Sequence, residues 1–380
     1  MELILKQYDI PLLRFSATND SSTPEIEVHW INEDQRHLLP LDMELSPEGI
    51  SRWMRRRTIP RNRAYVNRLL AKCGLNANRP MGILALCKGL SVDDSYWVVE
   101  DGFEGTFEKY NLFENRFSEV LALIAFTGYG SSNRSSLASS PEFTTNGMLP
   151  KCWRRISGKV TLYKGGTDGG YNTGAEPYCE YYAAQVAAAM GIDAIPYGLS
   201  QWKGRLCSTC ELFTDIDHAY MPIGNLVQRG GFDAVAAYYE KLGEPFQKAF
   251  RDMLVFDAVI CNTDRHYGNF GFMIDNKTNT IATPTPLFDH GNSLFNQAGP
   301  EDYESPEAFQ QYIDTLVPCV YDDFFATAKR FMTDENREQL RKLLGFRFKR
   351  HVRYNLPPKR LKLMEEQVRK RAMRLLENKD

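Results

Sequence analysis

Two short polar motifs stand out in this chain, NTDRHYGN at residues 262–269 and FDHG at residues 288–291. An apolar pattern at helical spacing covers residues 250–261 and stops where the first motif begins. The pattern therefore predicts a buried helix that delivers Asp264 into the loop directly after it.

The segment between the two motifs has the signature of a β-hairpin. Two apolar stretches, residues 270–274 and 281–288, flank a polar turn. A hairpin places its first and last residues side by side. We therefore expect Asn269 and Asp289 at one mouth, close to Asp264.

The residues expected at this mouth are suited to phosphoryl transfer. Magnesium takes hard oxygen ligands, usually one or two carboxylates together with the phosphates of the substrate. Asp289 and Asn269 can supply the protein ligands, which leaves Asp264 to orient an attacking hydroxyl and accept its proton. The plainer alternative is a polar loop in which Asp and Asn serve as turn formers. The combined spacing favours the functional interpretation.

A lysine in a predicted strand is the second informative feature. Residues 158–166 alternate so that Lys164 falls on the apolar face of the strand. A buried ammonium is costly without a counter-charge, and nucleotide phosphates or a glutamate on the following helix can supply one. That helix is predicted from Pro177 to Met190, with Glu180 as the favoured partner of Lys164 and Glu176 as the second candidate. Because Glu176 precedes Pro177, the plainer interpretation is that it only caps the helix.

No glycine-rich G-x-G-x-x-G loop precedes this strand. Gly147 and Lys151 are the substitute candidates, since they offer a flexible backbone with free amides and then a cation. A simple junction between loop and strand explains them equally well. The preceding residues, 131–146, are rich in Ser, Thr, Asn and Gly and predict a mobile loop.

The bulk composition is that of a globular enzyme. A chain of 380 residues is too long for one core, and 43% hydrophobic with 25% charged residues argues against disorder. The net charge of −2 gives no general attraction to nucleic acid or membrane. We find no stretch typical of a membrane span or a signal peptide, and the eight scattered cysteines favour a reducing, cytoplasmic location.

The pattern of elements predicts an α+β protein with two lobes, the first containing strands and the second mainly helical. The expected divisions are an accessory region at residues 1–110, a strand-containing lobe at 111–214 and a helical lobe at 215–380. Within the accessory region, Ser46–Leu75 predicts two helices, the second from Arg61 to Cys73, which carry seven arginines. They could form a DNA-reading helix-turn-helix. A solvated basic face or a docking surface for the rest of the protein is the favoured interpretation.

The chain resembles the HipA-like serine/threonine kinases of bacteria, which occur in toxin–antitoxin systems. The similarity is best from about Gly147 to Asp289 and is poor over residues 1–110. In the family, an Asp-x-His-x-x-Asn segment carries catalysis, a later aspartate binds metal, a strand lysine and a helix glutamate meet ATP, and an acid and an aromatic hold adenine. The matching residues here are Asp264, His266 and Asn269, then Asp289, Lys164, Glu180-Tyr181, Glu211 and Phe213.

The resemblance implies a protein kinase fold, ATP and Mg²⁺ as cofactors, a protein substrate with a Ser or Thr acceptor, and an antitoxin-like partner. It also implies an autophosphorylated loop, for which the candidates are Ser139, Ser140, Thr144 and Thr145. The alternatives are a small-molecule or lipid kinase, and a DNA-binding regulator that uses the kinase fold as a scaffold.

Overall fold

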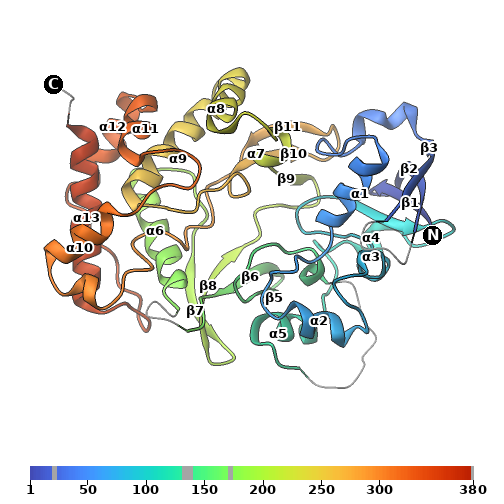
Figure 1. Cartoon of the computed structure of the whole chain (residues 1–380), viewed down its shortest axis with the longest axis horizontal. Coiled ribbons are helices and arrows are strands. Elements are labelled where there is room, and N and C mark those ends of the chain that lie inside the picture. Colours follow the sequence, from blue (N-terminus) through green and yellow to red (C-terminus); the bar gives the residue numbers. More distant parts are fainter. Residues whose placement is uncertain (19–23, 131–139, 170–173, 378–380) are drawn as a thin grey trace. The chain divides into compact units, whose positions relative to one another are not determined.

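The computed structural model describes residues 1–18, 24–130, 140–169 and 174–377 (Figure 1). The chain forms two compact units. The first comprises Met1–Lys164, Glu211–Met221 and Met273–Ala282, and the second Gly165–Cys210, Pro222–Phe272 and Thr283–Asp380. Over the described ranges, none of the helices combines the length and the apolar character needed to cross a bilayer.

The first unit begins with an antiparallel sheet in the order β3-β2-β1-β4, followed later by the antiparallel β5–β6 pair and the sheet β11-β10-β9. Each of the last three strands also has residues in the second unit. The strands are β1 Glu2–Gln7, β2 Ile10–Ala17, β3 Ile26–Ile31, β4 Tyr96–Glu100, β5 Lys151–Ile156, β6 Lys159–Gly165, β9 His218–Pro222, β10 Gly271–Asp275 and β11 Thr280–Pro284. The helices are η1 Glu33–Leu38, α1 Pro47–Arg56, α2 Val66–Lys72, α3 Pro80–Cys87, α4 Phe107–Tyr110, α5 Glu119–Thr127 and η2 Pro141–Phe143.

The adjacent strands β1 and β4 are buried on both faces, because alternate residues along each strand enter different cores. Leu5 and its cross-strand partner Val98 join one core with the helices α1 and α3. Ile4 and its partner Val99 join another, which also contains Trp153 of β5. The N-terminal sheet and the lysine-bearing β5–β6 pair therefore share one hydrophobic core.

The basic segment Ser46–Leu75 contains less helix than its sequence predicts. Ser46 caps α1 as expected, since its hydroxyl accepts from the amide of Gly49 at 3.1 Å. The second helix, however, begins only at Val66 and not at Arg61. The cause is a tertiary contact: the amide of Ala64 donates to Met148 O at 3.0 Å and is not available to a helix starting at residue 61.

Most arginines of this segment bind within the first unit. Arg56 pairs with Asp42 at 2.8 Å, Arg57 with Asp94 at 2.7 Å, Arg63 with Glu142, and Arg68 donates to Gly128 O at 2.9 Å. These contacts agree with a surface that docks onto the rest of the unit and leave few arginines for the bases of DNA.

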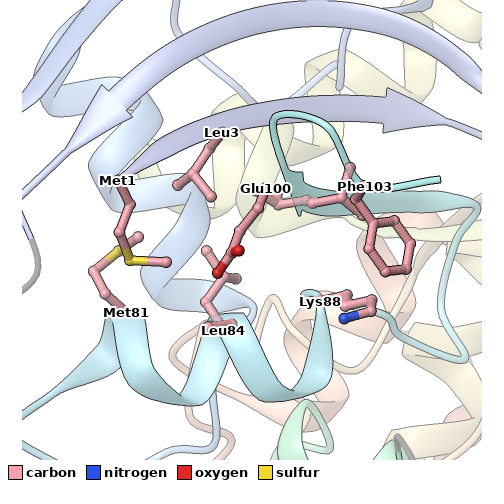
Figure 2. Close-up of a pocket in the computed structure, with 10 residues that line it drawn as sticks. Met1, Leu3, Met81, Leu84, Lys88, Glu100 and Phe103 are labelled. Carbon is pink, nitrogen blue, oxygen red and sulfur yellow. The ribbon is translucent and has the colours of Figure 1, made fainter. Parts of the chain in front are cut away.

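A cavity of about 120 Å³ lies in the same unit, lined by apolar side chains of β1, β4 and α3 (Figure 2). Leu3 and Leu84 are buried in its wall, and the ammonium of Lys88 lies 4.6 Å from the ring centre of Phe103. None of the residues predicted for chemistry lines this cavity.

The second unit is mainly helical and contains one antiparallel strand pair, β7 Gly198–Trp202 with β8 Arg205–Glu211, whose last residue belongs to the first unit. Its helices are α6 Glu176–Met190, α7 Ile223–Leu226, α8 Gly231–Leu242, α9 Phe246–Ile260, η3 Glu301–Tyr303, α10 Pro306–Asp314, α11 Phe324–Phe331, α12 Asp334–Arg341 and α13 Pro358–Leu376. Helix α9 packs against α8, α11 and α13 (Figure 1). The buried stripe predicted for the C-terminal helix is confirmed, since Leu361, Val368 and Leu375 are fully buried.

Of the predicted mobile loop at residues 131–146, the part 131–139 lies outside the described residues. The remainder is well packed and not mobile in character: Pro141–Phe143 form η2, and Ser140, Glu142 and Thr144 are buried. Glu142 is held by an ion pair with Arg63, a residue far away in the sequence, as described below.

The Arg57–Asp94 pair yields a stability prediction. Burial alone would lower the pKa of Arg57, but the carboxylate of Asp94 outweighs it and the net pKa is raised. Substituting Asp94→Ala leaves a buried guanidinium without its counter-charge, and we expect a loss of about 3–5 kcal/mol in the free energy of unfolding. Urea denaturation measures it. Asp101→Ala, which removes the exposed Arg14–Asp101 pair, is the control, and equal losses in the two variants would contradict the prediction.

Candidate functional site

The loop that carries Asp264 starts where helix α9 is stopped. Cys261 takes a left-handed conformation with φ of 54°, and its amide bonds back to Asp257 O. Asn262 follows and is fully buried, with its side-chain amide on Asp257 Oδ1 at 3.1 Å and its oxygen accepting from the amide of Asp264 at 3.1 Å. The helix end thus fixes the backbone at Asp264.

The centre of the loop is a buried ion pair between Arg265 and Asp257. Nε donates to Oδ2 at 2.9 Å and Nη2 to Oδ1 at 3.0 Å, a two-point contact between side chains that are 1% and 0% exposed. Burial by itself would lower the pKa of Arg265, but the carboxylate of Asp257 outweighs it and raises the net pKa. The guanidinium is therefore a permanent charge at this place.

The same guanidinium brings the two sequence motifs together. Its Nη1 donates to Asn269 O at 3.2 Å and to Phe288 O at 2.5 Å, and Nη2 lies 3.1 Å from His290 Nδ1. Asp264 precedes Arg265 in the chain, and Asp289 lies between Phe288 and His290. One buried side chain thus fixes the backbone next to all three residues expected at the hairpin mouth.

The side chain of Asp264 is half-buried and held by a second amide. Asn292 Nδ2 donates to Asp264 Oδ2 at 2.9 Å, and Asn292 Oδ1 in turn accepts from Asn296 at 2.9 Å. The carbonyl of Asn292 also accepts from the backbone and the hydroxyl of Thr263. One carboxylate oxygen of Asp264 is oriented in this way, and the other can meet a ligand.

Asn269 is oriented by the loop itself. It is 6% exposed, and its Nδ2 donates to Asp264 O at 3.2 Å, which leaves Oδ1 as the atom that can bind a cation. The neighbouring His266 is exposed, and its Nδ1 accepts from the amide of Gly268 at 3.0 Å. His266 therefore shapes the turn of the loop through one ring nitrogen and presents the other outward.

Asp289 has a strained backbone. Its φ is 55°, a left-handed value that costs a residue with a side chain roughly 1–3 kcal/mol unless the surroundings enforce it. The enforcing contacts are the donation from the Asp289 amide to the hydroxyl of Tyr197 at 3.0 Å and the bridge between Ala194 and Leu287. Burial, followed by the charge of Glu180, raises the pKa of Tyr197 well above its usual value, so the phenol stays neutral.

The lysines of the first unit lie together. Lys151 of β5 and Lys164 of β6 are direct cross-strand partners and are 7% and 6% exposed. Directly opposed residues share one face of a sheet, about 4.5–5.5 Å apart at Cβ, and like charges there repel each other. Gly147, with φ of 93°, lies against Lys151, because a Cβ on this glycine would be 2.1 Å from Lys151 Nζ. An anion bound beside the two ammonium groups would reduce their repulsion.

The remaining predicted residues have different surroundings. Glu180 is fully buried on α6. Glu176 is the first residue of α6 and accepts from the amide of Thr167 at 3.1 Å and from its hydroxyl. The expected capping role is wrong, because these donors belong to the segment before the helix and, among the described residues, no side chain caps α6. Glu211 is exposed and its carboxylate pairs with Lys159 at 2.7 Å, while Phe213 meets Tyr220 edge-on at 5.6 Å.

The donor atoms near Arg265 fit magnesium. An amide oxygen from Asn269 and a carboxylate from Asp289 are hard ligands, and phosphate oxygens of a nucleotide usually complete such a shell. Across the part of the chain that the structure describes, no three His, Cys, Asp or Glu side chains form a metal-binding group. The fit therefore applies to a cation that arrives with phosphates and not to a closed structural metal site.

Comparison with known proteins shows which fold the chain has. The structure of HipA from Shewanella oneidensis, solved with HipB and operator DNA, superposes with a TM-score of 0.52 and 14% identity, covering 98% of this chain and 97% of that chain. The chain has a HipA-like kinase fold. The predicted α+β kinase-like fold and the resemblance to HipA-like kinases are thereby confirmed.

Two further comparisons involve the kinase CtkA from Helicobacter pylori. A curated serine/threonine-protein kinase CtkA is 28% identical over 137 residues, which cover 32% of this chain and 41% of that protein. The match thus spans well under half of the curated relative. The crystal structure of CtkA covers 60% of this chain and 91% of that chain, with a TM-score of 0.45 and 14% identity. No protein-family model matches the chain.

Several residues that build the site were not predicted from the sequence. They are Asp257, Asn292, Tyr197 and Arg265, whose bonds to both motifs were not expected. Only Arg265 carries a usable signal, because an arginine between two motif residues next to a buried helix needs a nearby acid. Asp257 is eight positions earlier on α9, on the buried side of that helix. The roles of Asn292 and Tyr197 depend on the tertiary fold.

Removal of the counter-charge of Arg265 tests the importance of this pair. Asp257→Asn keeps the size of the side chain but leaves the buried guanidinium without a carboxylate, and we expect the free energy of unfolding to fall by about 3–5 kcal/mol. Chemical denaturation measures the loss. The control is Asp334→Asn, whose carboxylate is fully exposed and 3.9 Å from Arg337. An Asp257→Asn protein as stable as this control would show that the pair does not organise the unit.

Proposed function

We propose that the protein is an ATP- and Mg²⁺-dependent serine/threonine protein kinase of the HipA-like type. The observation that carries the proposal is the Arg265 hub, which fixes the backbone beside Asp264, Asn269 and Asp289. The sequence similarity to the kinase CtkA and the HipA-like fold support it.

Each of the three polar residues has a separate proposed role. Asp264, held by Asn292, orients the acceptor hydroxyl and takes its proton as the phosphoryl group is transferred. Asn269 and Asp289 hold the magnesium ion, which neutralises charge on the phosphates when it is bound. Buried contacts fix the backbone beside all three residues, and hydrogen bonds orient the side chains of Asp264 and Asn269, so little reorganisation is needed at the moment of reaction.

The lysines of the first unit are proposed to bind the phosphates of ATP. Lys151 and Lys164 share one face of the β5–β6 pair, so the negative charge of a triphosphate would offset their mutual repulsion. Gly147 gives the adjoining loop its left-handed turn. Glu180 is proposed as the partner of Lys164, and Glu211 with Phe213 as the residues that hold adenine.

Autophosphorylation is proposed on the loop before β5. Among the candidates, Ser139 lies outside the described residues, Ser140 and Thr144 are buried, and Thr145 is half-buried. Its hydroxyl accepts from Trp153 Nε1 at 3.0 Å and donates to Pro141 O at 2.7 Å. A phosphate on any of the three described residues requires local opening of this loop.

An antitoxin-like partner is proposed from the structural neighbour, since the HipA structure was solved together with HipB and operator DNA. Direct DNA reading by Ser46–Leu75 is not favoured. Arg56, Arg57, Arg63 and Arg68 are engaged within the unit, and base reading requires free side chains that reach base edges.

Loss of the proposed base tests the reaction. We expect Asp264→Asn to lower phosphoryl transfer by about 10²–10⁴-fold, the usual contribution of a positioned base, while folding is retained. Incubation with Mg-ATP followed by phosphate mapping with mass spectrometry measures the transfer. The control is Asp233→Asn at an exposed carboxylate. Transfer that continues at the wild-type rate in Asp264→Asn would refute the assignment.

The lysine pair gives a separate binding prediction. Lys151→Ala and Lys164→Ala should each raise the Kd for ATP by roughly tenfold or more, as expected when a charged hydrogen bond is lost. Lys164→Arg should restore binding only in part, because a planar fork does not replace a point charge. Titration with a fluorescent ATP analogue measures the Kd. Lys277→Ala, at an exposed ammonium in the same unit, is the control, and equal Kd values in all variants would exclude the role.

A further inference from the structure

A second buried arginine lies in the first unit, in the region whose role the sequence leaves open. Arg63 and Glu142 are separated by 79 positions, and both side chains are 0% exposed. A buried pair of this kind is costly to desolvate and is maintained only if further hydrogen bonds satisfy the charges. The additional partners of Arg63 are therefore informative.

Those partners are the two ends of one short loop. Arg63 Nη1 donates to Thr145 O at 3.4 Å, and Nη2 donates to Lys151 O at 2.9 Å. The adjacent Ala64 amide donates to Met148 O at 3.0 Å, in the middle of the same segment. The stretch from Thr145 to Lys151, called the anchored loop below, is thus tied at both ends and at its centre to residues 63–64.

Glu142 also binds strand β5, which follows the anchored loop. Its Oε1 accepts from the amide of Trp153 at 2.8 Å, and the indole of Trp153 donates to the hydroxyl of Thr145 at 3.0 Å. Burial raises the pKa of Glu142, and the positive charges of Arg63 and Lys151 oppose that rise.

The anchored loop contains the groups that a phosphate requires. Gly147 turns the backbone through a left-handed conformation, and the Lys151 ammonium is folded back against it. Lys151 is also the cross-strand partner of Lys164. Backbone amides at such a turn, next to a cation, form an anion-binding concavity.

We propose that Arg63 is a positioning residue for the phosphates of the nucleotide, acting through the anchored loop and Lys151. This inference rests on the proposed kinase function and extends it: the N-terminal region supplies a structural part of the nucleotide site. In a kinase that lacks a G-x-G-x-x-G loop, one guanidinium then replaces the rigidity that glycine turns and strand pairing usually give.

The test compares two buried arginines of the same segment. Arg63→Lys keeps the charge but loses the fork that spans both loop ends. Arg57→Lys is the matched control, because Arg57 makes a similar set of bonds to Asp94, Gly89 O and Tyr96 O and none to the anchored loop. Three quantities are measured on each full-length protein: the Kd of a fluorescent ATP analogue with Mg²⁺, amide hydrogen exchange of residues 145–151, and the thermal midpoint.

We expect both variants to lose thermal stability, while only Arg63→Lys weakens nucleotide binding and speeds exchange of the anchored loop. The weakening should be roughly tenfold or more, as expected when a charged hydrogen bond to the phosphates is misplaced. Glu142→Gln, which removes the charge that holds Arg63, should give the same pair of effects.

Two results would overturn the inference. In the first, Arg63→Lys binds nucleotide and exchanges like the wild type. In the second, Arg57→Lys weakens binding as much as Arg63→Lys, so that the loss reflects general instability. Failure of the wild-type protein to bind nucleotide would instead overturn the proposed function, and the exchange data would then still decide whether Arg63 holds the loop.

Discussion

The ion pair between Arg265 and Asp257 is the constraint on which the geometry of the candidate site depends. A guanidinium has five donors in a rigid plane, so one side chain can bind a carboxylate at two points and still reach carbonyl oxygens elsewhere. Here the carboxylate belongs to helix α9, and the carbonyls belong to Asn269 and Phe288. A helix, a loop and the end of a hairpin are joined at one buried point.

The first unit contains a similar arrangement, in which a buried arginine binds a carboxylate and the carbonyl oxygens of a loop. Arg63 binds Glu142 and reaches the carbonyls of Thr145 and Lys151. In both places the backbone of an irregular loop forms no regular ladder of hydrogen bonds. Buried carbonyl oxygens without donors would cost about 1–3 kcal/mol each, so a charged donor beneath the loop both satisfies them and fixes their positions.

Sequence patterns predicted well those features that depend on local periodicity. Helix α9, the stripe of α13 and the β10–β11 hairpin follow from apolar spacing, and the polar residues stand out because they interrupt it. The predicted start of helix α2, at Arg61, was wrong. Residues 140–144 were predicted to belong to a mobile loop, but they are packed and buried. Both errors have one cause: the bonds of residues 63–64 to a segment about eighty positions later decide the local structure, and no window of sequence contains both partners.

The same distinction separates the residues proposed to act on a ligand from the residues that position them. Asp264, Asn269 and Asp289 are recognisable because they are polar in places where the surrounding pattern is apolar. Their supports are buried and distant in sequence, and some conflict with local preference. Asp289 shows this most clearly, since its φ of 55° is unfavourable for an aspartate taken alone. The contacts of its neighbours with Arg265 and of its own amide with Tyr197 impose that conformation. The strained backbone therefore marks a position at which the placement of a carboxylate costs local stability.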